Sequence, residues 1–173
     1  MNDPILPCGG WLSTLSTIAV ILSPENLVAF AENVHRQGAR LVLTNGCFDL
    51  LHVGHVRYLQ HARSLGDVLL VAVNSDASIR SLKGAERPVN SQENRAEILA
   101  AIRCVDCVTI FDSLRATQVI QKVRPVLYAK GGDYTVDTLD PEEATALVEV
   151  GAEIRFIPPT LGYSTTSLIG RLR

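Results

Sequence analysis

The fold of this chain is decided by residues 41–55, which read LVLTNGCFDLLHVGH. The apolar start predicts a short strand, a Thr-Asn-Gly turn ends it, and His52 and His55 flank Gly54 where the next helix should begin. The first backbone N–H groups of a helix lack intrahelical partners, and the helix dipole adds positive potential there. The stretch therefore predicts an anion site, in which Gly54 admits a phosphate to the backbone and two imidazoles donate hydrogen bonds.

The composition favours a single globular domain. The chain has 173 residues, of which 47% are hydrophobic, and this is enough for one full core. Its net charge of −2 disfavours a protein that binds nucleic acid, because such proteins present a strongly basic face. Four cysteines are present, and Cys104 and Cys107 form a CxxC without the second pair that a zinc site needs. We interpret the cysteines as reduced thiols of a cytoplasmic protein.

An apolar run near the N-terminus, residues 11–22, is too short to cross a bilayer. No Lys or Arg precedes it, so it also lacks the basic region of a signal peptide. We interpret residues 1–22 as an extension that packs on the domain or on a partner subunit, and residues 23–173 as the domain. Because an exposed apolar run would be a liability on a monomer, we expect a homodimer or higher homo-oligomer and no membrane contact.

Apolar runs alternate with helical patterns along the rest of the chain. This alternation predicts a Rossmann-like, doubly wound α/β fold, with a mainly parallel five-stranded sheet and helices on both faces. The strands are expected at residues 40–44, 67–73, 105–111, 126–129 and 153–157. Ser23, Asn90 and Asp140 are the expected N-caps of three of the helices.

The polar loops of the chain each follow the end of a predicted strand. They lie at residues 44–55, 74–76, 130–134 and 163–166. In doubly wound sheets, ligands bind beyond the carboxyl ends of the strands, at the point where the strand order reverses. We therefore expect these loops to form one site.

The phosphate motifs of two large nucleotide-binding classes are absent from this sequence. No GxGxxG follows the first strand, which disfavours a dinucleotide oxidoreductase, and the GxxxxGK[ST] of P-loop kinases is missing. Separate cations remain as phosphate ligands: Lys83 beside Gly84, and Arg87 and Arg95 downstream. A planar guanidinium suits a phosphate, whereas a lysine in such a loop is more commonly a solvated surface residue.

Two further stretches combine flexibility with polar groups. Residues 130–134, KGGDY, offer two glycines for close backbone approach, although an ordinary Gly-Gly turn explains them equally well. Residues 163–167, YSTTS, begin a helix with adjacent hydroxyl groups, which commonly serve only as caps.

The pattern G-x-F-D-x-x-H-x-G-H, filled without a gap at residues 46–55, resembles the mark of the nucleotidyltransferase superfamily. The resemblance extends from about residue 23 to residue 173. It implies catalytic roles at the reacting phosphate for His52, His55 and Lys83. It implies nucleotide contacts from Thr44, Asn45, Gly46, Cys47, Phe48, Gly54, Lys130, Gly131, Asp133, Ser164, Thr165 and Thr166. It implies contacts to the second substrate from Asp49, Asn74, Asp76, Arg87 and Arg95. No side chain is expected to hold a metal ion.

More narrowly, stretches such as VNSDASIRSLKG, LAAIRCVD and GYSTTSLI are similar to the adenylyltransferases of ADP-heptose synthesis. This resemblance implies that ATP and D-glycero-β-D-manno-heptose 1-phosphate react to ADP-heptose and diphosphate, for the lipopolysaccharide core. Mg²⁺ would accompany ATP, held by phosphate oxygens and water. The sugar kinase that is often fused to this activity has no counterpart in the chain, so we expect a separate enzyme to phosphorylate the sugar.

Two alternatives stay open at the level of sequence. A cytidylyltransferase acting on glycerol 3-phosphate or another small phosphoalcohol would need the same phosphate-handling motifs. A non-catalytic domain that senses a nucleotide would share the fold, although it has little need of His52, His55 and Lys83 together.

Overall fold

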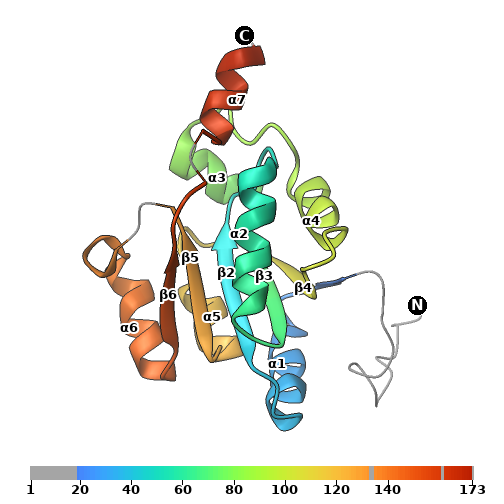
Figure 1. Ribbon diagram of the computed structural model, residues 1–173, viewed down its shortest axis with the longest axis vertical. Helices are drawn as coiled ribbons and strands as arrows, with labels where there is room; N and C mark the ends of the chain where they lie inside the picture. The colour runs from blue at the N-terminus through green and yellow to red at the C-terminus, as the bar shows by residue number, and fades with distance from the viewer. Residues whose placement is uncertain (1–18, 133–134, 161, 173) are drawn as a thin grey trace.

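The computed structural model describes residues 19–132, 135–160 and 162–172. Within these residues one sheet has six strands in the order β1-β4-β3-β2-β5-β6, and all neighbouring strands are parallel (Figure 1). The strands are β1 (Val20–Leu22), β2 (Leu41–Gly46), β3 (Val68–Asn74), β4 (Cys107–Phe111), β5 (Leu127–Gly131) and β6 (Glu153–Ile157). The predicted doubly wound α/β fold is confirmed, but the expected count of five strands was wrong.

The additional strand, β1, comes from the segment that we had assigned to the N-terminal extension. It pairs with β4 at the edge of the sheet, and Thr109 Oγ1 donates a hydrogen bond of 3.0 Å to Leu22 O. A strand of three residues is too short for an alternating pattern to be recognised. The boundary between residues 22 and 23 stays a prediction, and residues 1–18, Cys8 among them, lie outside the described residues.

Helices cover both faces of the sheet. They are α1 (Leu27–Arg36), α2 (Val53–Ser64), α3 (Asp76–Lys83), α4 (Gln92–Ala100), α5 (Thr117–Val123), α6 (Pro141–Val150) and α7 (Thr165–Leu172), with a 3-10 helix, η1 (Val136–Thr138). Helices α1, α5 and α6 pack on one face, and α2 and α4 on the other (Figure 1). Among the described residues, no helix is both long and apolar enough to span a membrane.

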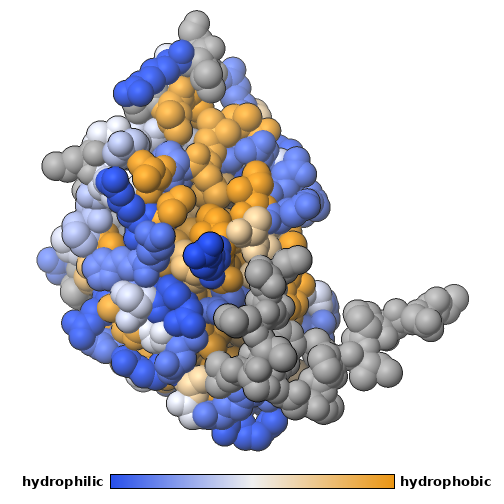
Figure 2. Space-filling view, turned by 45° about the vertical axis from the view of Figure 1, so that its right-hand side comes forward, coloured by the Kyte–Doolittle hydropathy of each residue, from blue (hydrophilic) through white to orange (hydrophobic). Residues whose placement is uncertain are grey.

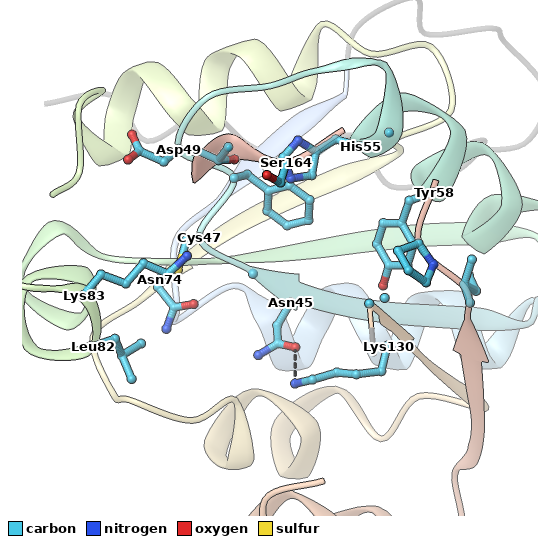
Figure 3. A pocket seen from close by; sticks show the side chains of 18 of the residues that line it. Asn45, Cys47, Asp49, His55, Tyr58, Asn74, Leu82, Lys83, Lys130 and Ser164 are labelled. Carbon is cyan, nitrogen blue, oxygen red and sulfur yellow. Dashed lines mark hydrogen bonds between the residues drawn. The ribbon is translucent and has the colours of Figure 1, made fainter. Parts of the chain in front are cut away.

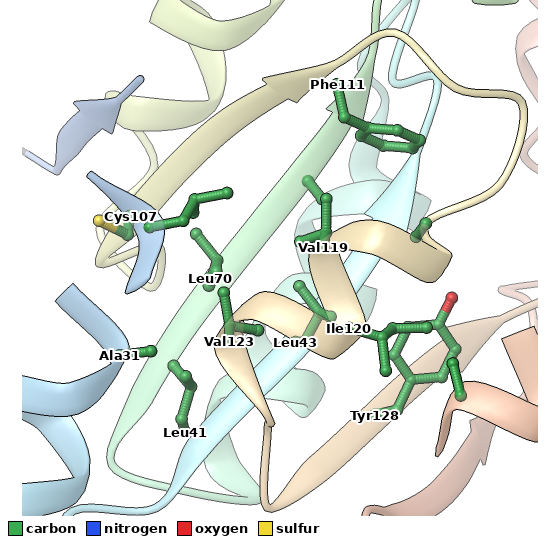
Figure 4. Packing of buried hydrophobic residues seen from close by; sticks show 14 of the residues in the cluster. Ala31, Leu41, Leu43, Leu70, Cys107, Phe111, Val119, Ile120, Val123 and Tyr128 are labelled. Atoms are coloured by element: carbon green, nitrogen blue, oxygen red, sulfur yellow. The ribbon is translucent and has the colours of Figure 1, made fainter. Parts of the chain in front are cut away.

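Side chains of the central strands point alternately into two apolar cores. In β2, Leu41 and Leu43 pack beneath α1 and α5 (Figure 4), whereas Val42 belongs to the core beneath α2. All three are buried, as are most residues of β3. Burial on both faces explains why these strands read as continuous apolar runs in the sequence.

The helix caps differ from expectation at two of three positions. Asp140 caps α6 by accepting hydrogen bonds from Glu142 N and Glu143 N, as predicted. Helix α1 begins after Asn26 instead of Ser23, and α4 is capped by Ser91 instead of Asn90. Ser91 Oγ accepts from Asn94 N, whereas the backbone and side-chain N–H groups of Asn90 bond to Asp49.

The sheet changes its winding direction between β2 and β5. Strand β2 pairs with β3 on one side and with β5 on the other, so the chain winds outwards in both directions from β2. The turns that leave β2 and β5 therefore diverge and leave a crevice at the carboxyl end of the sheet. This is where the predicted loops meet.

Gly66 tests the packing between the end of α2 and the sheet. A Cβ there would lie 2.6 Å from Val42 Cγ2 and 2.7 Å from Arg40 O, a backbone atom that cannot easily move. We expect Gly66→Ala to lower the free energy of unfolding by roughly 1–3 kcal/mol through overpacking. Gly170→Ala is the control, because a Cβ there meets nothing within 4 Å. Urea unfolding measures both, and equal stabilities would contradict the packing described.

Candidate active site

A cleft of about 970 Å³ lies at the carboxyl end of the sheet (Figure 3). Its walls contain most of the predicted site residues: Asn45, Gly46, Cys47, Phe48, Asp49, His52, Gly54, His55, Asn74, Lys83, Arg87, Lys130, Gly131, Ser164 and Thr165. Three predicted residues do not line it, namely Thr44, Asp76 and Arg95. Asp133 lies outside the described residues, and the side chain of Thr166 is likewise not described.

The two histidines are stacked at the start of α2. His52 is the N-cap residue, with an extended backbone, and its ring centroid lies 3.9 Å from that of His55. The backbone N–H of His52 donates to His55 Nδ1 over 3.4 Å. Because Nδ1 accepts, the proton of a neutral His55 must be on Nε2. The helix therefore presents an imidazole whose Nε2–H can donate to a ligand.

The pKa of His55 is lowered from 6.5 to about 4, first by burial and then by the charges of His52 and Lys83. The pKa of His52 is also lowered by burial. Both imidazoles are therefore mostly neutral near pH 7. A neutral donor at a helix N-terminus, with the Lys83 ammonium in the same cleft, suits an anionic ligand.

Close packing around the histidines explains two residues of the sequence pattern. A Cβ at Gly54 would lie 2.9 Å from the His52 ring, so only glycine leaves room for the stacked pair. Phe48 has a φ of 45°, in the left-handed region, and its ring lies 5.4 Å from that of His55. Backbone strain at a non-glycine residue of this kind is typical of functional sites.

Asp49 fastens the loop between α3 and α4 to the turn after β2. Its buried carboxylate accepts hydrogen bonds from Arg87 Nε over 2.6 Å and from the backbone N–H groups of Val89 and Asn90. Burial raises the pKa of Asp49, but these hydrogen bonds outweigh it and hold the pKa below its usual value. Arg87 thereby reaches the cleft wall, where its buried Nη2 has no hydrogen-bond partner among the described residues.

Arg95 is placed behind the cleft instead of in it. Its side chain is fully buried, and its three nitrogens donate to Asn90 O, to Cys47 O over 2.6 Å and to the Asp76 carboxylate over 2.8 Å. In this conformation the guanidinium joins α3, α4 and the turn after β2. It holds the cleft wall from behind, and it has no access to a ligand there.

The floor of the cleft, where β2 and β5 end, carries a polar network that we had not predicted. Lys130 forms an ion pair of 2.8 Å with Glu143 of α6, and both contact Asn45 and the Tyr128 hydroxyl. Glu143 stands three residues after the predicted N-cap Asp140, where a glutamate is typical of a helix start, and from the sequence we assigned it no part in the site. The signal that the sequence offered for this network was a carboxylate on the side of α6 that faces the core.

Tyr58 of α2 is a second lining residue that sequence reasoning missed. Its hydroxyl donates to Ala129 O over 3.0 Å and shares a hydrogen bond of 2.6 Å with Thr44 Oγ1. A Cβ at Gly131 would lie 2.6 Å from the Tyr58 ring, so the first glycine of KGGDY serves this contact. Thr44, which we expected to touch a nucleotide, is completely buried in this interaction.

The remaining walls come from segments that are distant in sequence. Ser164 and Thr165 lie at the start of α7, and Thr165 Oγ1 donates to Leu50 O over 3.3 Å. On the opposite side, Arg115 pairs with Asp140 over 2.6 Å. Further lining residues absent from our prediction include Leu82, Leu114, Asp137, Thr138 and Tyr163.

This chain is similar in sequence to a known family and to known proteins. A family model described as cytidylyltransferase-like matches residues 43–171. The Bifunctional protein HldE of Geotalea uraniireducens (strain Rf4) is 46% identical over 155 residues, which cover 90% of this chain and 31% of that protein. The HldE of Geobacter sulfurreducens is 50% identical over 136 residues, 79% of this chain and 27% of that protein. The chain thus spans less than a third of the length of these relatives.

Two solved structures share the fold. The lipopolysaccharide core biosynthesis protein from Thermoplasma volcanium GSS1 superposes with a TM-score of 0.59 at 24% identity, covering 71% of this chain and 98% of that one. The pantoate-beta-alanine ligase from Francisella tularensis gives a TM-score of 0.56 at 12% identity, covering 87% of this chain and 76% of that one. At these identities the comparison supports the architecture of the sheet and helices alone.

The lowered pKa of His55 makes stability depend on pH. The unfolded chain takes up a proton near pH 6.5 but the folded chain only near pH 4, so His55 lowers stability as the pH falls between these values. We expect the free energy of unfolding to fall more steeply over this range in the wild type than in His55→Asn. Urea unfolding at a series of pH values measures the slopes.

His61→Asn is the matched control, because it makes the same substitution at an exposed position of the same helix. Parallel curves for the wild type and His55→Asn would mean that His55 titrates like a free histidine.

Proposed function

This chain belongs to the cytidylyltransferase-like family and is a nucleotidyltransferase, and on that premise we propose that it is an adenylyltransferase. The proposed reaction joins ATP and D-glycero-β-D-manno-heptose 1-phosphate to ADP-D-glycero-β-D-manno-heptose and releases diphosphate. The similarity to the HldE proteins and the resemblance of the motifs to adenylyltransferases of ADP-heptose synthesis support this choice of substrates. The proposed role is the supply of a precursor for the lipopolysaccharide core.

The observation that carries the proposal is the stacked histidine pair at the start of α2, with Lys83 in the same cleft. In the transfer, an oxygen of the sugar phosphate attacks the α-phosphorus of ATP. The bond from that phosphorus to the bridging oxygen breaks, and diphosphate leaves with the electron pair. Negative charge grows on the α-phosphate oxygens, and the Nε2–H of neutral His55, the helix N-terminus and Lys83 would stabilise it.

The remaining residues would bind and orient the two substrates. We assign the sugar phosphate to Arg87, whose Nη2 has no partner among the described residues and whose Nε is oriented by Asp49. Arg95 would act indirectly, by holding Cys47 and Asn90 in place. Ser164, Thr165 and the Gly131 turn would meet the nucleotide.

Magnesium is expected to enter with the triphosphate. The described residues contain no group of three or more His, Cys, Asp or Glu side chains that could hold a metal ion. Phosphate oxygens and water are the ligands that Mg²⁺ prefers when the protein offers no such group. We therefore treat the ion as part of the substrate and assign no step to it.

The substrates are tested by measuring diphosphate release from four pairs: ATP or CTP, each with heptose 1-phosphate or glycerol 3-phosphate. We expect ATP with heptose 1-phosphate to give the highest kcat/KM, by roughly a hundredfold or more over the other pairs. A preference for CTP with glycerol 3-phosphate would replace the proposal by the cytidylyltransferase alternative. Binding of a nucleotide without turnover of any pair would indicate a sensing domain.

The role of His55 is tested by His55→Ala. We expect single-turnover diphosphate release to slow by roughly a hundredfold or more, with a much smaller change in the Kd of ATP, because the lost donor acts on charge that develops in the transition state. His61→Ala, on the exposed side of α2, is the control and should match the wild type. Equal losses in rate and binding would show that His55 holds the ground state instead.

A further inference from the structure

The ion pair on the floor of the cleft neutralises Lys130 within the protein. Lys130 Nζ lies 2.8 Å from Glu143 Oε2, and the two residues are 9% and 1% exposed. Lys130 comes from the end of β5 and Glu143 from the first turn of α6. A cation paired in this way contributes little net charge to a ligand, so a role other than phosphate binding has to be sought for it.

The pair is joined to the side chain of Asn45. Asn45 Oδ1 accepts a hydrogen bond from Lys130 Nζ over 3.0 Å (Figure 3) and another from the Tyr128 hydroxyl over 2.7 Å. Its Nδ2 donates to Glu143 Oε1 over 3.3 Å. If the Asn45 amide were flipped, its N–H groups would face the two donors, Lys130 Nζ and the Tyr128 hydroxyl. Its oxygen would then face the Glu143 carboxylate. The network therefore permits a single orientation of the Asn45 amide.

This orientation leaves a donor on the cleft side. Nδ2 carries two N–H groups, and among the described residues Glu143 is its hydrogen-bond acceptor. Asn45 lines the cleft at the switch point between β2 and β5. The donor is neutral and stands beside a neutralised ion pair, whereas the cationic groups Lys83 and Arg87 belong to the α3 side of the cleft. A neutral donor without surplus positive charge suits an uncharged oxygen better than a phosphate.

We propose that Glu143 and Lys130 are positioning residues that hold the Asn45 amide as a fixed hydrogen-bond donor to a hydroxyl group of the bound substrate. This inference rests on the proposed function, because both of its substrates carry hydroxyl groups: the ribose of ATP and the acceptor sugar. The family resemblance implies that Lys130 contacts the nucleotide. In this proposal the Lys130 ammonium instead pairs with Glu143 and donates to Asn45.

A cycle of variants distinguishes a positioning pair from a phosphate ligand. Lys130→Met and Glu143→Gln each leave one buried charge uncompensated, and we expect each to weaken ATP binding or raise the KM of the sugar phosphate by roughly tenfold. The double variant removes both charges and should regain part of this loss, because the effects of the two changes are coupled. Isothermal calorimetry and steady-state kinetics measure the affinities, and thermal unfolding shows whether each variant is folded.

Glu142→Gln, an exposed neighbour on α6, is the matched control and should leave both affinities unchanged. The proposal is overturned if Glu143→Gln tightens ATP binding while the double variant stays as weak as Lys130→Met. In that case Lys130 would bind a phosphate of the ligand, and Glu143 would compete with that phosphate for the Lys130 ammonium.

The hydroxyl group is identified with Asn45→Ala and nucleotide analogues. If the ribose is the source, the wild type should bind ATP roughly tenfold more tightly than 2′-deoxy-ATP or 3′-deoxy-ATP, and Asn45→Ala should lose this preference. If the acceptor sugar is the source, the analogues bind equally and Asn45→Ala raises the KM of the sugar phosphate alone. Asn45→Ala without either effect overturns the proposal.

Failure of the proposed function is visible separately. It would appear in the wild type as absence of turnover with heptose 1-phosphate, before any variant is compared. The arm with nucleotide analogues measures binding and needs no turnover, so it still decides whether Asn45 recognises a ribose hydroxyl.

Discussion

The site depends on the buried carboxylate of Asp49. A carboxylate removed from water is costly unless hydrogen bonds replace its hydration, and here Arg87 and two backbone N–H groups do so. The same bonds hold the loop after α3 against the turn that leads into α2. Arg95 completes this arrangement from behind, through Cys47 O and Asn90 O. The positions of the histidines and of Arg87 thus follow from satisfying two buried charges.

The cleft has two chemically different ends. Near α2, the neutral His55, the helix N-terminus and Lys83 offer hydrogen bonds and positive potential without a histidine charge near pH 7. On the β5 side, Lys130 is neutralised by Glu143, and the floor offers an amide. A ligand that carries phosphates at one end and hydroxyl groups at the other fits this division. A nucleotide and a sugar phosphate both have that character.

Contiguous patterns predicted the doubly wound fold and most of the cleft, because the carboxyl ends of parallel strands meet irrespective of the details of packing. Contacts between distant segments could not be predicted in this way. An arginine near a helix start looked like a phosphate ligand, yet partners at Cys47 and Asp76 hold Arg95 out of the cleft. Glu143 fitted a capping pattern, which concealed its reach to Lys130. The strand β1 was too short to show any period.

Tyr58 joins two walls of the cleft, α2 and the turn after β5. Its hydroxyl bonds to Ala129 O and Thr44 Oγ1, and its ring lies against Gly131, so α2 and the turn after β5 cannot separate without breaking these contacts. A further wall carries α7, which projects from the body (Figure 1), and it contacts the body through the bond from Thr165 Oγ1 to Leu50 O and through the stacking of Tyr163 on His52. Figure 2 shows apolar side chains continuing up to this projecting end of the molecule. A ligand therefore meets α2 and the turn after β5 as surfaces that are already in place, with no rearrangement needed between them.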